Sequence, residues 1–204
     1  MGDGPQEQDG RQAVAKIRIA QDEAADEVLS RDPFALLCGM LLDQQFPMES
    51  AFMGPAKVQE RFGTLDPAEL AAADPEAFAE MCAVPPAVHR YPRSMAGRIQ
   101  DLARHVQTEY DGDTERLWTE ATSGRDLMRR LQALPGFGKQ KAQIFVALVG
   151  KQLGVQPDGW REAAGSYGEE GSFRSVADVV DQESLERVRT FKKDMKAKKR
   201  AASA

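Results

Sequence analysis

The sequence predicts an all-α fold in which two helical lobes flank a groove. Aspartate–proline pairs occur at three places, and such a pair starts a helix because the aspartate caps it and the proline suits its first turn. Apolar residues recur at spacings of three and four, and no segment reads as a multi-stranded sheet. With 204 residues and 42% apolar side chains, the chain buries a real core and is not a disulfide-stapled mini-protein.

The predicted helices follow these start signals along the chain. Asp32-Pro33 starts a helix that runs to Gln45 and is apolar nearly all round, so it is expected to lie buried at the centre. Pro47 ends it and opens the next helix, over 48–62, which stops at Gly63. The other two pairs, at 66–67 and 74–75, each start a short helix. Further helices are expected at about 94–110, 113–120, 124–133, 139–152, 159–164 and 182–199, and a short extended piece at 13–19.

We expect a single domain between two disordered ends. Residues 1–12, which are polar and acidic over most of their length, and residues 201–204 are predicted to be disordered. Residues 13–200 form the domain, with a middle helical lobe at about 33–120. The second lobe takes 121–200 together with the N-terminal segment.

The distribution of charge matters more than its sum. The net charge of −5 weighs mildly against binding nucleic acid, but eight basic residues lie between Arg187 and Arg200 and a second basic group lies within 89–104. Acidic residues concentrate in the first 32 positions and in 66–80. One positive face is therefore expected. The N-terminus lacks the pattern of a signal peptide, and the apolar runs are shorter than a membrane span, which predicts an intracellular protein without a membrane segment.

Cysteine and histidine are too sparse for a metal centre. The chain has two cysteines and two histidines and no Cys-x-x-Cys pair, so a zinc site or an iron–sulfur cluster is excluded. Cys38 lies in the apolar run 34–42 and is interpreted as a small core residue rather than a redox group.

The most specific motif is a tight hairpin between two helices, Leu134-Pro135-Gly136-Phe137-Gly138-Lys139-Gln140-Lys141-Ala142. Gly136 and Gly138 can take positive φ angles, and Phe137 can point inward and hold the two helices together. The first N–H groups of the second helix are then unpaired and face outward, where they and the helix dipole favour a phosphate. Lys139 and Lys141 are interpreted as phosphate contacts that add salt-dependent attraction. The alternative is a packing corner with glycine caps.

This hairpin resembles that of the helix–hairpin–helix/Gly-Pro-Asp DNA glycosylases, the superfamily of endonuclease III and 3-methyladenine glycosylase II. The resemblance runs from about Asp32 to Trp160 and includes Leu41-Leu42-Asp43-Gln44-Gln45, which looks like the helix end whose glutamine fills the gap left by a flipped base. It implies Asp158 as the catalytic carboxylate, at the family's spacing from Gln140. Pro157 and Gly159 flank it where the family has valine and threonine or serine, so a turn or capping role is the alternative.

The resemblance also implies a reaction and a partner. Bifunctional members carry a lysine at the position of Gln140, which cannot form a Schiff base, so a monofunctional glycosylase acting on double-stranded DNA with a damaged base is expected. The rival reading is a non-catalytic protein of the same fold that binds distorted DNA. The protein is expected to be a cytoplasmic, nucleoid-associated monomer. No cofactor or metal is expected, with a monovalent cation at the hairpin carbonyls as the open alternative.

Several side chains are candidates for handling the flipped base. Gln45, with Gln44 beside it, is the first candidate for a wedge into the duplex, and His89 and Arg90, beside Tyr91 in a proline-rich loop, are candidates for the opposite wedge. Phe46, Trp160 and Asp43 are candidates for the lesion pocket, where aromatic rings would favour a cationic alkylated base. Asp43 is also an alternative to Asp158 as the functional carboxylate, or a simple helix cap.

Overall fold

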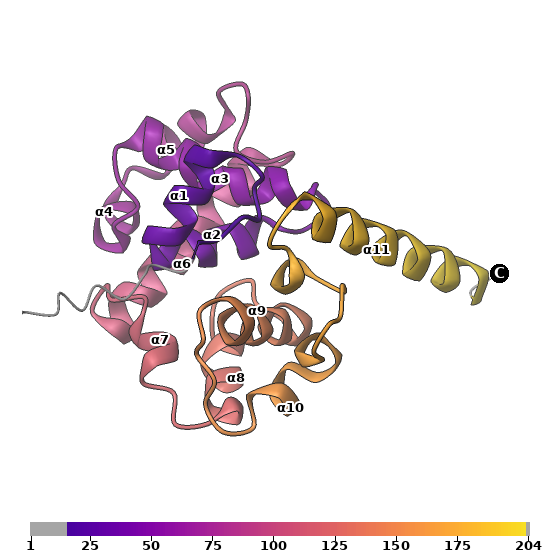
Figure 1. Ribbon diagram of the computed structural model, residues 1–204. Helices are drawn as coiled ribbons and strands as arrows, with labels where there is room; N and C mark the ends of the chain where they lie inside the picture. Colours follow the sequence, from indigo (N-terminus) through magenta and orange to yellow (C-terminus); the bar gives the residue numbers. More distant parts are fainter. Residues whose placement is uncertain (1–15, 203–204) are drawn as a thin grey trace, which may run out of the picture.

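The computed structural model describes residues 16–202, and these residues form an all-α fold (Figure 1). Its elements are α1 (Glu23–Arg31), α2 (Pro33–Leu42), α3 (Met48–Phe62), α4 (Pro67–Ala72), α5 (Pro75–Ala83), α6 (Pro92–Tyr110), α7 (Arg116–Thr119), α8 (Gly124–Gln132), α9 (Lys139–Gln152), α10 (Trp160–Ala164) and α11 (Gln182–Ala202), with short 3-10 helices η1 (Gly165–Gly168) and η2 (Val176–Asp178). No strand occurs between residues 16 and 202, which confirms the predicted fold class. None of the helices in this range is long and apolar enough to cross a membrane.

The three aspartate–proline pairs start helices as predicted. The carboxylate of Asp32 accepts hydrogen bonds from two backbone N–H groups of the first turn of α2, and Asp66 does the same for α4. Asp74 accepts one such bond at the start of α5. In all three helices proline occupies the first turn, where its missing N–H has no partner to lose.

The helices pack in two groups. In the first group, α2 and α3 pack against each other, α6 packs against α4 and α5, and every residue of α2 from Phe34 to Leu42 is buried. In the second, α9 packs against α8, α10, η1 and η2. The N-terminal segment was expected in the second group, whereas α1 packs against α2 and α3 in the first.

Helix α2 ends three residues earlier than the sequence predicts, and a distant lysine explains why. A continued helix would use the carbonyls of Met40 and Leu41 to accept the N–H groups of Gln44 and Gln45. The Nζ atom of Lys141 donates to both carbonyls instead, at 2.7 and 2.6 Å. The chain then turns through residues 43–47, called the wedge loop below.

Helix α11 runs past the body of the molecule and projects from it (Figure 1). Its buried residues, Ser184, Leu185 and Val188, all lie in the first half, and from Lys192 to Ala202 its residues are exposed. The helix includes residues 201 and 202, which were predicted to be disordered. The predictions for residues 1–12 and 203–204 lie outside the described residues.

Candidate DNA-binding site

The hairpin is a sharp turn between α8 and α9, as the motif predicts. Gly136 takes a φ of +81°, the left-handed conformation that glycine adopts without strain. Phe137 is buried, and its ring lies 6.1 Å from that of Phe145 on α9 in an edge-on arrangement. The aromatic contact therefore holds the turn against the second helix while the glycines remain at the surface.

The first turn of α9 offers unpaired backbone donors. Within the described part of the chain, the N–H groups of residues 138–141 have no backbone acceptor, and no side chain caps the helix. Gly138, Lys139 and Gln140 are exposed. Aligned free N–H groups at the positive end of a helix dipole attract an anion, so this surface has the geometry of a phosphate site. The Gln140 side chain donates to the Tyr167 hydroxyl at 2.8 Å.

Gly138 differs from the expectation in an informative way. Its φ is −75°, which any residue adopts, and a Cβ atom placed there would meet no protein atom within 4 Å. Nothing in the described chain therefore requires glycine at this position. A ligand that approaches the backbone closely would require it, because a side chain would occupy the space that the ligand fills.

We expect Gly138→Ala to keep or slightly raise the stability of the protein, by up to about 1 kcal/mol, and to weaken binding to duplex DNA about tenfold or more. Gly136→Ala is the matched control. It should lower stability by about 1 kcal/mol or more, because φ is positive and the new Cβ would lie 2.6 Å from Leu41 Cδ1. Urea unfolding and fluorescence anisotropy measure the two effects. Unchanged DNA affinity in stable Gly138→Ala protein would contradict the phosphate site.

The side chain of Lys141 is half-buried and turned toward α2, so its predicted role as a phosphate contact stays a prediction. Its ammonium donates to the two α2 carbonyls described above, so it stabilises the negative end of that helix. Burial lowers the pKa of Lys141 to about 8, although the nearby Asp43 carboxylate acts in the opposite direction. Lys141 thus joins the hairpin helix to the end of α2 across a separation of 100 residues. Its backbone N–H remains available to an anion.

Asp43 lies at this junction and is flanked by cations from two other helices. Its carboxylate is 3.9 Å from Lys192 Nζ on α11, and its side chain is 12% exposed. Burial raises the pKa of Asp43, while the charges of Lys192 and Lys141 lower it. Glu49, at the start of α3, forms an ion pair with Arg189 of α11. The end of α2, the start of α9 and the middle of α11 therefore meet around one carboxylate.

The wedge candidates separate into exposed and buried side chains. Gln45 is exposed and has a φ of +51°. Residues other than glycine seldom adopt this conformation, and those that do cluster at functional sites. Arg90 is also exposed, with its guanidinium over the ring of Tyr91. His89, by contrast, is buried, and its ring bonds to the Gln44 carbonyl and to the Tyr91 N–H. His89 positions the two loops and does not present a wedge.

Asp158 lies at the opposite end of the hairpin helices. Its carbonyl accepts from the N–H of Gly124, the first residue of α8, whereas the hairpin follows the last residue of that helix. A helix of this length spans about 13 Å. Asp158 is exposed beside a cavity of about 560 Å³ whose lining residues all lie in, or directly before, α8 and α10. It is therefore apart from the hairpin and from the wedge loop.

The three residues predicted for a lesion pocket do not come together. Trp160 is buried near Asp158, and its ring packs against Gly150 in the second half of α9, where a Cβ atom would lie 2.5 Å from the ring. Phe46 lies on the wedge loop, with its ring centroid 4.6 Å from that of His89 and the two rings tilted by 53°. Phe46 and Asp43 share the wedge loop. Trp160, which is buried against α9, is a core residue.

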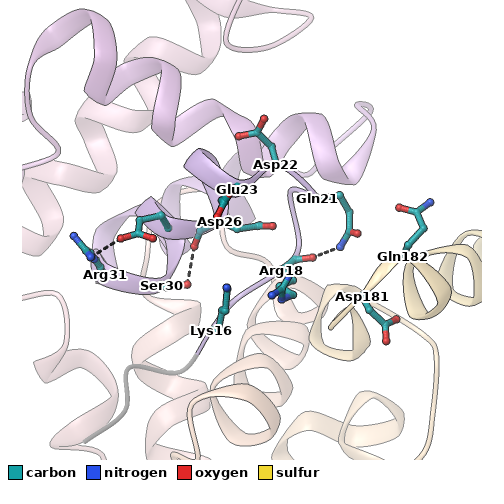
Figure 2. Close-up of a pocket in the computed structure, with 11 residues that line it drawn as sticks. Lys16, Arg18, Gln21, Asp22, Glu23, Asp26, Ser30, Arg31, Asp181 and Gln182 are labelled. Atoms are coloured by element: carbon teal, nitrogen blue, oxygen red, sulfur yellow. Dashed lines mark hydrogen bonds and ion pairs between the residues drawn. The ribbon is translucent and has the colours of Figure 1, made fainter. Parts of the chain in front are cut away.

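Several features escaped prediction. Arg189 and Lys192 reach the wedge loop and the start of α3 only because α11 crosses the molecule there, and no local pattern marks that path. A cavity of about 720 Å³ also lies between the N-terminal segment with α1 and the start of α11 (Figure 2). Lysine, arginine and carboxylate side chains line it together, among them Arg18 and Asp181. Residues 16–202 contain no group of three His, Cys, Asp or Glu side chains suited to a metal ion.

Comparison with known proteins agrees with the hairpin geometry. The family model described as "HhH-GPD superfamily base excision DNA repair protein" matches residues 38–204, which is most of the chain. No curated protein and no solved structure matches. The match includes the end of α2, the hairpin and all of α11. The chain belongs to the HhH-GPD superfamily of base excision DNA repair proteins.

Proposed function

We propose that this base excision repair protein is a monofunctional DNA N-glycosylase that acts on double-stranded DNA with a damaged base. The observation that carries the proposal is the exposed row of unpaired N–H groups at the start of α9. Lys141, in the same helical turn, holds this row next to the end of α2, which precedes Gln45. A phosphate held at this row would place the duplex beside the wedge loop. Gln45 would then fill the gap left by the flipped base. Unstacking that base costs a few kcal/mol.

The reaction needs a carboxylate near the sugar. Cleavage of the N-glycosidic bond leaves positive charge on the sugar, and an ionised carboxylate stabilises that charge and orients the attacking water. Family spacing favours Asp158, whose distance from the hairpin argues against it. Asp43 lies at the hairpin end of the molecule, two residues before Gln45, in a desolvated setting where electrostatic stabilisation is stronger. We therefore propose Asp43 as the functional carboxylate and keep Asp158 as the competing assignment.

Strand cleavage is not part of the proposed activity. The hairpin position that would supply a Schiff-base amine holds Gln140, whose amide is bonded to Tyr167. The amine of the neighbouring Lys141 is engaged by the two α2 carbonyls. A lyase step would need an amine that is free to attack the sugar.

A panel of duplexes with alkylated, deaminated or oxidised bases tests the proposal. We expect wild-type protein to release at least one class of base, to leave an intact abasic strand, and to give no covalent adduct with borohydride. An adduct would contradict the monofunctional assignment. Binding to the lesion duplexes with no base released from any would support the second candidate, a protein that recognises distorted DNA without catalysis. The exposed position of Asp158, far from the hairpin, is the observation that favours this candidate.

A further inference from the structure

The distal half of α11 has a surface that the hairpin does not explain. Its proximal half is held against the body by buried Leu185 and Val188 and by the ion pair of Arg189 with Glu49. Lys192 then reaches Asp43 in the wedge loop. Beyond that residue the helix continues to Ala202 without burying a side chain, and Figure 1 shows it extending away from both lobes. Contacts with the core do not stabilise this part of the helix, so packing does not determine which residues it contains.

The basic residues of this distal half share one face. At about 100° per residue, Lys192, Lys193, Lys196 and Arg200 fall within an arc of about 100° around the helix axis. Arg189, which contacts the body, lies in the same arc. The face that meets the wedge loop and α3 in the first half therefore continues as a basic stripe in the second. The acidic Asp194 lies outside the arc.

These charges are not used within the described chain. Lys193, Lys196 and Arg200 are exposed, and no carboxylate among residues 16–202 lies within ion-pair distance of them. Several other arginines of the structure, such as Arg31, Arg104 and Arg129, each pair with an acid three or four residues earlier on their own helix. A row of unneutralised cations that begins next to the wedge loop and runs outward along α11 complements a polyanion that follows the helix.

We propose that the stripe formed by Lys193, Lys196 and Arg200 binds the phosphate backbone of duplex DNA flanking the lesion, as a second contact that is independent of the hairpin. The inference rests on the proposed DNA-binding function. Ten residues of helix beyond Lys192 span about 15 Å, which corresponds to about four base pairs along a duplex. Such contacts carry no base specificity and lengthen the footprint on one side of the lesion.

The test uses the full chain and an undamaged 25-base-pair duplex of mixed sequence. The stripe variant is Lys193→Gln, Lys196→Gln and Arg200→Gln combined. The control variant is Arg31→Gln, Arg104→Gln and Arg129→Gln combined, which changes the net charge equally on exposed positions of other helices. Fluorescence anisotropy at several salt concentrations gives the slope of log K against log salt. Each phosphate contact contributes about 0.9 to this slope.

We expect the stripe variant to lose about 2 to 3 units of slope and to bind at least about tenfold more weakly at low salt, while the control loses less than about one unit. On a duplex that carries a single lesion, a hydroxyl-radical footprint of the wild type should extend about four base pairs further on one side than that of the stripe variant. Equal slopes for wild type and stripe variant, or equal losses in stripe and control variants, would overturn the inference while leaving the hairpin site intact. Failure of the wild type to bind DNA would remove the proposed function and this inference together.

Discussion

Asp43→Asn is expected to slow base release about 100-fold or more under single-turnover conditions, whereas Asp158→Asn stays within about threefold of wild type. The amide keeps the shape of the carboxylate but removes the negative charge that stabilises the oxocarbenium-like transition state. Asp43 lies at the junction of α2, α9 and α11, and Asp158 lies at the far end of α8. Single-turnover rates on saturated lesion duplex separate this effect from any loss of affinity.

The pH dependence gives a second measure of the same residue. Because burial raises the pKa of Asp43, its carboxylate takes up a proton, as the pH falls, at a higher pH than an ordinary aspartate does. Base release should fall over that range in the wild type. The opposite result, a large loss in Asp158→Asn and none in Asp43→Asn, would favour the family spacing over the geometry. Unfolding midpoints of both variants check that the fold is intact.

Lys141→Met is expected to destabilise the protein by about 2 to 3 kcal/mol and to leave the salt dependence of DNA binding unchanged. The substitution removes two charge-assisted hydrogen bonds to the α2 carbonyls and takes a counter-charge from Asp43. Lys139→Met is the matched control, because Lys139 is exposed in the same helical turn. It should change stability by less than about 0.5 kcal/mol and reduce the salt slope by about 0.9.

The stability difference between wild type and Lys141→Met should also depend on pH. Burial lowers the pKa of Lys141 from its ordinary 10.5 to about 8, so between these values the unfolded chain binds the proton and the native chain does not. Wild-type stability relative to the variant therefore rises with pH across this window. Urea midpoints of both proteins between pH 7 and 10.5 measure it. A reduced salt slope in Lys141→Met, with unchanged stability, would instead support the phosphate role predicted from the sequence.

The local parts of the fold were predictable because their signals are local. Aspartate caps and prolines set the starts of three helices, and the hairpin motif specified its own turn. Helix α1 is absent from the predicted elements because only Ala25 and Leu29 among its apolar residues are buried, in a run rich in acid. The early end of α2 was not predictable either, since it depends on an amine that approaches from α9.

The candidate site was predictable only where sequence neighbours share it. Gly138, Lys139 and Gln140 lie together because one helical turn holds them, and Asp43 and Gln45 because one loop does. The family resemblance implied that Asp158 acts together with the hairpin, but the loop after α9 lies at the far end of the helix pair. His89 reads as a loop residue, and its burial follows from contacts with Gln44, 45 positions earlier.

The hydrogen bonds between Lys141 and the end of α2 fix the distance between the start of α9 and the wedge loop. The donors for a phosphate begin on the same helical turn as Lys141, and Gln45 follows α2 by three residues. The distance between a phosphate bound at the start of α9 and the side chain of Gln45 is therefore fixed, and the Lys141 amine maintains it. The protein would act as a ruler along the strand, engaging a damaged nucleotide only at one set number of nucleotides from the phosphate that it holds.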